Sequence, residues 1–201
     1  MSKIYSIMNS GSVFGLFLQV IPITLLAGIV YAALRCVYVK RHNVSVRLGT
    51  ESARLLFVLY LTGLVNLVLV PANLWICIWA NIFVGYSHSV ITLFSGDFNL
   101  VPTVLEMLAG RITPGRWTLT MLAYNLLMFV PLGFFLPIVS EKIRNRNILK
   151  IAVIVPVSVE LIQPVVGRSF DTDDIILNFV GIILGYFIAV LALKACRKKT
   201  I

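Results

Sequence analysis

Charged residues are scarce in this 201-residue chain, and acidic residues are the scarcest among them. Only 12% of the residues are Asp, Glu, Lys or Arg, whereas 59% are hydrophobic, and the mean hydropathy is +0.97. A soluble domain of this size could not cover so much apolar surface, whereas a lipid bilayer removes the need to cover it. The composition therefore excludes an ordinary soluble domain and predicts an integral membrane protein.

The sequence also lacks the familiar motifs of cysteine chemistry and of many enzymes. Cys36, Cys77 and Cys196 stand far apart, without the paired spacing of a disulfide framework or a zinc site. There is no P-loop, no GxGxxG, no GxSxG and no HExxH sequence. The net charge of +9 does not indicate nucleic-acid binding, because basic residues beside apolar stretches are what membrane orientation requires. We therefore expect no nucleic-acid partner and no resident cofactor.

Five apolar stretches are long enough to cross a bilayer. Each is close to the ~20 residues that cover ~30 Å of hydrocarbon. They are residues 13–34, 53–70, 118–138, 149–166 and 175–194. We predict an all-α fold, a polytopic transmembrane bundle of about five spans. Its expected parts are an N-terminal helix and basic loop (1–50), a transmembrane domain (51–195) and a basic tail (196–201).

The basic residues predict how the chain is oriented. With five spans and the N-terminus outside, 13 of the 17 Lys and Arg residues face the cytoplasm, as the positive-inside rule requires. A sixth span at 72–94 would place the basic residues of 35–54 on the opposite side from the other basic groups. Residues 72–94 are therefore expected to lie in the outer interface or to re-enter the membrane, with Trp75, Trp79 and Tyr86 at headgroup depth.

Polar side chains in the predicted helices lie at a common depth. Charged groups at a helix centre cost about 2.5–3.5 kcal/mol on insertion scales, so polar residues there need a reason. At 1.5 Å per residue, the polar positions fall within roughly 4–11 Å of the outer surface. They are Gln19, Asn66, Asn125, Glu160, Gln163 and Asn178. This pattern predicts a pocket that opens to the outside.

Helical spacing groups the polar residues near the C-terminus into two stripes. The first contains Glu160, Gln163 and Gly167; the second contains Asp171, Asp174, Asn178, Gly181 and Gly185. Glycines that continue a polar stripe let a second helix approach closely, so that the polar groups meet partners. Arg168 lies between the stripes, and we expect it to be the counter-ion of Glu160 or of the aspartates.

Each of these residues also has a structural interpretation. Asp171 can cap the last helix by accepting backbone N–H groups, and Asp173 or Asp174 could serve the same end. Asn125 and Asn178 could simply tie helices together.

Several of these residues form a pattern that resembles a known family. Residues 125–134, NLLMFVPLGF, are similar to the NxxxFxPLGF signature of the VanZ-like membrane proteins. Residues 158–185 resemble the family's S-x-E-x-x-Q…GR-x-x-D-x-D-D-x-x-x-N-x-x-G-x-x-x-G pattern. Residues 99–102, NLVP, resemble its upstream NL-x-P element, although Thr103 stands where that element usually has Phe. The resemblance covers about residues 50–195.

The resemblance implies a multi-pass protein of the bacterial plasma membrane. Founding members of the family are associated with low-level resistance to the lipoglycopeptide teicoplanin, with little effect on vancomycin. On this basis we expect an outer-leaflet pocket that binds or modifies an envelope lipid or a lipoglycopeptide. Its candidate ligand-binding residues are Asn99, Arg116, Asn125, Glu160, Gln163, Arg168, Asp171, Asp173, Asp174 and Asn178.

Two other classes of function remain open. A metal-dependent enzyme acting on an envelope lipid could hold Mg²⁺ or Ca²⁺ through Asp171, Asp173 and Asp174, with Glu160 as a general base. A small transporter or scaffold is the third class. The inner halves of the predicted helices hold almost no polar groups, which argues against a path through the membrane.

Overall fold

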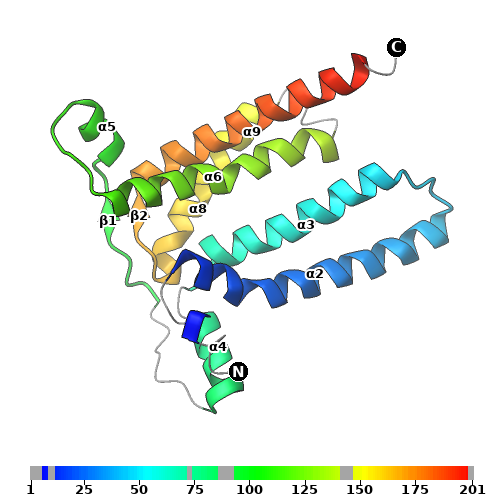
Figure 1. Ribbon diagram of the computed structural model, residues 1–201, viewed down its shortest axis with the longest axis horizontal. Coiled ribbons are helices and arrows are strands. Elements are labelled where there is room, and N and C mark those ends of the chain that lie inside the picture. Colours follow the sequence, from blue (N-terminus) through cyan, green and yellow to red (C-terminus); the bar gives the residue numbers. More distant parts are fainter. Residues whose placement is uncertain (1–5, 9–11, 72–73, 86–92, 141–146, 199–201) are drawn as a thin grey trace. The chain divides into compact units, whose positions relative to one another are not determined.

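The computed structural model describes residues 6–8, 12–71, 74–85, 93–140 and 147–198, and most of these residues are helical. The chain forms two compact units (Figure 1). The first unit contains Met1–Gly96 and Ile162–Arg168. The second contains Asp97–Leu161 and Ser169–Ile201.

The first unit is built on an antiparallel pair of long helices, α2 (Val13–His42) and α3 (Leu48–Val68), seen side by side in Figure 1. Ser12 caps the start of α2 by accepting the N–H of Gly15 at 3.1 Å. Asn43 ends α2 in the left-handed conformation, which a short polar side chain tolerates. Gly28 lets the two helices pack closely, because a Cβ atom there would lie 2.5 Å from Leu59 Cδ2.

After α3, part of the apolar segment 72–94 forms a short helix, α4 (Leu74–Val84). Its 11 residues would extend only roughly 16 Å, too short to cross a bilayer. Trp79 Nε1 donates to the carbonyl of Gln19 at 3.0 Å, which ties α4 to α2. The prediction that 72–94 is not a sixth span agrees with this length. Residues 72–73 and 86–92, including Tyr86, lie outside the described residues.

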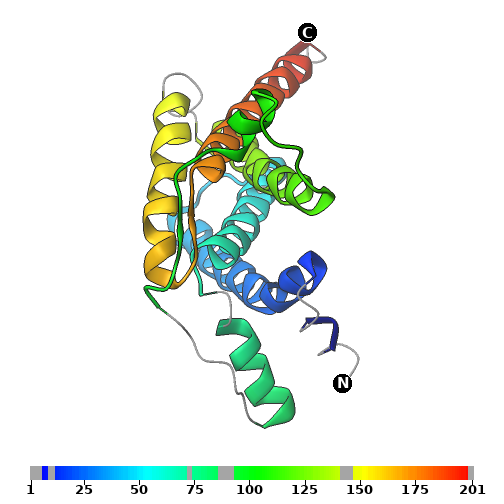
Figure 2. The ribbon, with the colours of Figure 1, turned by 90° about the vertical axis from the view of Figure 1, so that its left-hand side faces the viewer.

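The second unit contains three long helices and a small strand pair. The helices are α6 (Arg116–Val139), α8 (Ile148–Ile162) and α9 (Thr172–Lys198). The two-residue strands β1 (Phe98–Asn99) and β2 (Phe170–Asp171) pair in parallel and run side by side in Figure 2. A short helix, α5 (Thr103–Leu108), follows β1. The 3-10 turn η1 (Gln163–Val166), which follows α8, belongs to the first unit.

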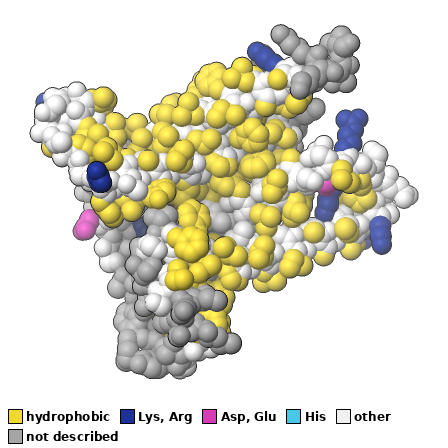
Figure 3. All heavy atoms as spheres, in the orientation of Figure 1, with side chains coloured by type: hydrophobic (Ala, Val, Ile, Leu, Met, Phe, Trp, Pro, Cys, Tyr) yellow, Lys and Arg dark blue, Asp and Glu magenta, His cyan; other side chains and the backbone are white. Residues whose placement is uncertain are grey.

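Among the described residues, five helices are long and apolar enough to cross a membrane, which confirms the predicted spans. The helices continue through Pro22, Pro131, Pro137 and Pro156, so none of these prolines ends a span. Hydrophobic side chains cover much of the helix surfaces visible in Figure 3. Such apolar surfaces suit contact with the hydrocarbon of a lipid bilayer. The chain is therefore a multi-pass, all-α membrane protein.

Candidate functional site

Close packing of α6 against α9 positions the polar residues of the second unit. A Cβ atom on Gly133 would lie 1.9 Å from the carbonyl oxygen of Ile182, and one on Gly185 would lie 1.9 Å from that of Val130. A Cβ atom on Gly181 would likewise lie 2.3 Å from the carbonyl oxygen of Leu126. Contact positions advance together along both helices, so α6 and α9 run parallel. The predicted role of Gly181 and Gly185 in close helix approach is confirmed.

This packing brings Asn125 of α6 to Asp174 of α9. The side-chain amide of Asn125 donates a short hydrogen bond to Asp174 Oδ1. Asp174 lies in the first turn of α9, where the helix dipole favours a negative charge. The expectation that this polar stripe meets a partner on a neighbouring helix is therefore confirmed for Asp174.

Asp171 joins the strand pair to the start of α9. Its Oδ1 accepts the N–H of Asp173 at 2.9 Å, which is the geometry of a helix N-cap, and α9 begins at Thr172. Its Oδ2 accepts from Asn99 Nδ2 at 3.2 Å. The backbone N–H of Asp171 donates to Glu160 Oε2 at 2.9 Å. The capping interpretation of Asp171 is thus confirmed, and Glu160 supports the same turn from α8.

Asp173 organises a different helix. Its side chain is 1% exposed, and its two carboxylate oxygens accept the N–H groups of Thr103 at 2.7 Å and Val104 at 2.9 Å. These are the first N–H groups of α5, which have no partner within their own helix. The suggestion that Asp173 caps α9 is therefore wrong: its carboxylate caps α5, 70 residues away in sequence.

We call the set Asn99, Asn125, Glu160, Asp171, Asp173 and Asp174 the polar network. Thr172 extends it, since its hydroxyl donates to the carbonyl of Asn99 at 2.7 Å. All these residues belong to the second unit. Glu160 is fully buried, and the Asp171 N–H is a hydrogen-bond donor to its carboxylate, as a buried polar group requires.

Asn178 lies one helical turn beyond Asp174 and is 3% exposed. Its Oδ1 is buried and has no hydrogen-bond partner among the described residues. A buried acceptor without a donor costs roughly 1–3 kcal/mol. Native structures rarely tolerate this without a reason, such as a site that a ligand or water completes.

The three remaining candidate residues have other surroundings. Gln163 is buried in the first unit and donates to the carbonyl of Val68 at 3.5 Å. Arg168, in the same unit, donates from Nε to the carbonyl of Val70 at 3.4 Å. Arg116 is the first residue of α6 and is exposed. The expected pairing of Arg168 with Glu160 or the aspartates would join the two units and stays a prediction.

Two features of this region were not predicted from the sequence. One is the pairing of β1 with β2, and the other is α5 with its cap. The segment around α5 also exposes large apolar side chains, including Leu108 (80% exposed) and Trp117 (72% exposed). The alternation of apolar and polar residues in 98–108 is too short to reveal a six-residue helix.

The enzyme hypothesis requires acidic side chains that are grouped as metal ligands. Within the described ranges, no three His, Cys, Asp or Glu side chains are grouped so that they could hold a metal ion. The carboxylates of Asp171, Asp173 and Glu160 instead accept backbone N–H groups.

Comparison with known proteins agrees with the sequence motifs. A family model described as VanZ/LLP1 matches residues 57–193, about two thirds of the chain. No curated protein and no solved structure matches. The matched range includes every residue of the polar network and Asn178.

Proposed function

We propose that this member of the VanZ/LLP1 family binds an envelope lipid or a lipid-tailed glycopeptide at the outer leaflet of the bacterial plasma membrane. The chain belongs to the family because the family model matches it over most of its length. The site is the polar network together with Asn178. The observation that carries the proposal is the buried Asn178 Oδ1, which lacks a donor in a region otherwise rich in paired polar groups.

The basic residues support the orientation that the proposal needs. Lys40, Arg41 and Arg47 lie where α2 ends and α3 begins, and Lys194 lies near the end of α9. The positive-inside rule places these ends in the cytoplasm. The N-terminal ends of α6 and α9, with the polar network, then face outward, as does the N-terminus of the chain.

The apolar surface near the network supports a lipid ligand. Leu105 and Leu108 of α5 and Trp117 of α6 are all exposed, although large apolar side chains in contact with water are unfavourable. At the depth of the headgroups, Trp and Leu side chains can contact acyl chains while nearby backbone groups stay hydrated. An acyl chain would thus lie beside these residues, and its polar head would reach the network.

Each polar residue has a suitable role in such a complex. Asn178 Oδ1 would accept a hydroxyl or amide N–H of the ligand, the one interaction that it lacks in the described structure. The exposed guanidinium of Arg116 would pair with a phosphate or carboxylate. Asn99 and Asn125, which also belong to the second unit, would hydrogen-bond the head group as the sequence pattern predicts.

The rival enzyme hypothesis uses the same carboxylates as metal ligands. Their hydrogen bonds to backbone N–H groups favour a structural and binding role over metal coordination. We therefore favour binding. A chelator that abolished the effect on teicoplanin susceptibility would favour the enzyme.

We expect expression of this chain in a susceptible Gram-positive host to raise the minimal inhibitory concentration of teicoplanin but not that of vancomycin. Teicoplanin carries an acyl chain that vancomycin lacks, so only teicoplanin offers a lipid tail to the site. Glu160→Gln should return the teicoplanin value to that of the host. The Gln side chain keeps an oxygen that can accept the Asp171 N–H, so the substitution removes the charge with little change in shape.

Membrane levels of wild type and variant must be matched by immunoblot. If neither protein changes either value, teicoplanin is not the ligand of this chain. If Glu160→Gln is as active as wild type, the charge of Glu160 has no part in binding.

Asn178→Leu separates binding from folding. Leucine has the same number and branching of side-chain heavy atoms and no polar atom to leave without a partner, so we expect the free energy of unfolding to stay within about 1 kcal/mol of wild type. The teicoplanin effect should nevertheless be lost. Asn66→Leu in α3 is the matched control, because Asn66 Nδ2 donates within its own helix to Thr62 at 2.8 Å. Thermal stability in detergent and susceptibility would be measured together, and a fully active Asn178→Leu protein would remove Asn178 from the site.

A further inference from the structure

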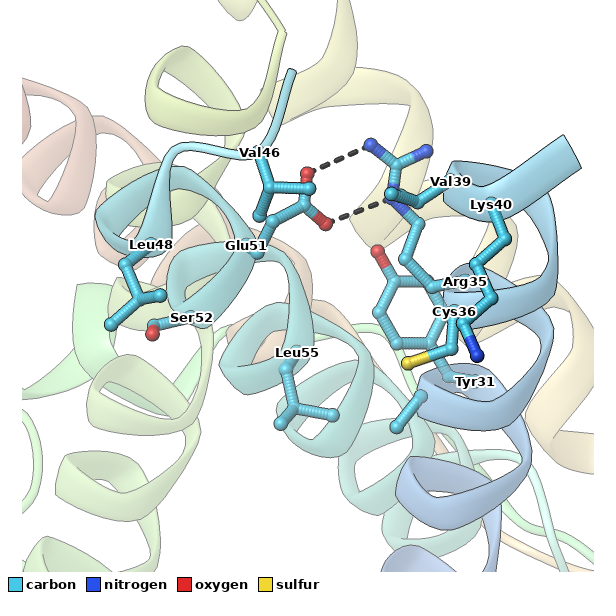
Figure 4. Close-up of a pocket in the computed structure, with 11 residues that line it drawn as sticks. Tyr31, Arg35, Cys36, Val39, Lys40, Val46, Leu48, Glu51, Ser52 and Leu55 are labelled. Carbon is cyan, nitrogen blue, oxygen red and sulfur yellow. Dashed lines mark hydrogen bonds and ion pairs between the residues drawn. The ribbon is translucent and has the colours of Figure 1, made fainter. Parts of the chain in front are cut away.

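A pocket lies in the first unit, lined by residues that are far in sequence from the polar network. It has a volume of about 360 Å³ and lies between the end of α2 and the start of α3. Figure 4 shows Tyr31, Cys36 and Lys40 on α2, with Leu48 and Leu55 on α3. The volume is within the range of small-ligand sites, roughly 300–1,000 Å³.

The pocket has an apolar interior. Side chains of Val39, Val46, Leu48 and Leu55 are among those that line it. Val46 and Leu48 are also exposed, so their apolar surface extends from the pocket to its mouth. Such an interior fits an acyl chain, because the apolar side chains can make van der Waals contacts along it.

The same pocket has an excess of positive charge. Glu51 Oε1 accepts from Arg35 at 2.7 Å and from Arg54 at 2.6 Å, and Glu51 Oε2 accepts from Arg35 Nε at 2.8 Å. The single negative charge of Glu51 is thus shared by two guanidinium groups. Lys40 also lines the pocket, is exposed and forms no ion pair with any described residue.

The guanidinium of Arg35 is fixed in place. Besides its two hydrogen bonds to Glu51, it lies over the ring of Tyr38, with its central carbon 5.3 Å from the ring centroid. Arg35 is therefore less able than Lys40 to move toward a ligand. Lys40 is the cation available to an incoming anion.

We propose that this pocket binds an anionic phospholipid, with an acyl chain between α2 and α3 and the phosphate at Lys40. The combination of an apolar interior and unbalanced positive charge fits both parts of such a lipid. A basic pocket between transmembrane helices is a known way to recognise anionic headgroups. This site is independent of the ligand proposed for the polar network.

Other occupants fit less well. Inorganic phosphate would use the charge but not the apolar interior. A second copy of this chain, related by a two-fold axis, would bring the same excess of positive charge against itself, which is unfavourable.

Cys36 offers a direct test, because it lines the pocket and is exposed. In full-length protein carrying Cys196→Ser, a water-soluble maleimide should label Cys36, since Cys77 is buried. Dioleoyl phosphatidylglycerol, titrated into mixed micelles, should slow this labelling, and dioleoyl phosphatidylcholine should not.

Lys40→Gln should raise the phosphatidylglycerol fraction that gives half-maximal protection of Cys36 about fivefold, the effect of one Lys near a lipid phosphate. Arg41→Gln removes the same charge from a neighbour that does not line the pocket, and it should leave the value unchanged.

A second measurement does not depend on Cys36. Ala32→Trp should fill the pocket, whereas Ala33→Trp is a control because Ala33 does not line it. In native mass spectrometry, the Ala32→Trp protein should retain one phosphatidylglycerol molecule fewer than the Ala33→Trp protein. Equal protection by the two lipids, or equal shifts for Lys40→Gln and Arg41→Gln, would overturn the proposal. So would protection by inorganic phosphate alone, or lipid-free protection that grows with protein concentration, which would indicate a second copy.

Discussion

Gly185→Ala should lower the free energy of unfolding by about 3 kcal/mol, near the upper end of the usual cost of overpacking. The new methyl group would lie 1.9 Å from the carbonyl oxygen of Val130 and 2.8 Å from the backbone nitrogen of Phe134. Both neighbours are backbone atoms of a continuous helix, so they cannot move aside as a flexible side chain can. The whole of α6 must shift, and its contacts with α9 are then lost.

Heating the detergent-solubilised protein and measuring the fraction that stays monodisperse would reveal this effect. For a chain of this size, such a loss corresponds to a midpoint roughly 6–12 °C lower. Gly49→Ala is the control, because nothing lies within 4 Å of a Cβ atom there and alanine favours the helix. Equal midpoints for the two variants would show that α6 and α9 are not in backbone contact.

Asp173→Asn should release the start of α5 while the long helices remain folded. The buried carboxylate accepts two N–H groups at once, whereas an amide offers only one oxygen and places an NH₂ group against the other donor. Hydrogen bonds to a charged group contribute about 1.5–3 kcal/mol. We therefore expect hydrogen exchange at Thr103 and Val104 to quicken by roughly 10- to 100-fold.

Hydrogen-exchange mass spectrometry of a peptide from 99–110 would test this, with trypsin cleavage at Arg111 as a second readout. Asp97→Asn is the matched control, because Asp97 is exposed and the N–H groups of Thr103 and Val104 donate to Asp173 instead. Unchanged exchange in Asp173→Asn would mean that α5 does not depend on this carboxylate. A teicoplanin effect that falls with the loosening of α5 would link this helix to the proposed binding site.

Hydropathy alone was sufficient to predict the long helices, because a membrane span needs a long, nearly uncharged segment that few other structures share. The predicted first span begins at Val13, as α2 does, but it ends at Leu34, whereas α2 continues to His42. Arg35, Lys40 and Arg41 were interpreted as loop residues, but long basic side chains can extend a helix beyond the hydrocarbon by reaching toward the headgroups.

The polar network was only partly predictable. Helical spacing connected Asp174 with the glycines of α9, and a close partner helix followed from that pattern. Nothing in the local sequence connected Asp173 with Thr103, since the bond depends on two segments 70 residues apart. The residue types in two distant segments indicate which interactions each segment can make, but only the folded structure shows which residues pair.

The pairing of β1 with β2 also constrains when the network can form during synthesis. Asn99 meets Asp171, 72 residues later, and a nascent chain that has not yet reached Phe170 has no partner for the first strand. Glu160 then lacks the N–H of Asp171, and α5 lacks its cap from Asp173. Contacts between such distant residues form late in folding, because the intervening chain must first be ordered. The ribosome must therefore deliver the beginning of the last helix before this end of the protein can assemble, and a premature stop upstream of residue 170 would leave every earlier element of the network incomplete.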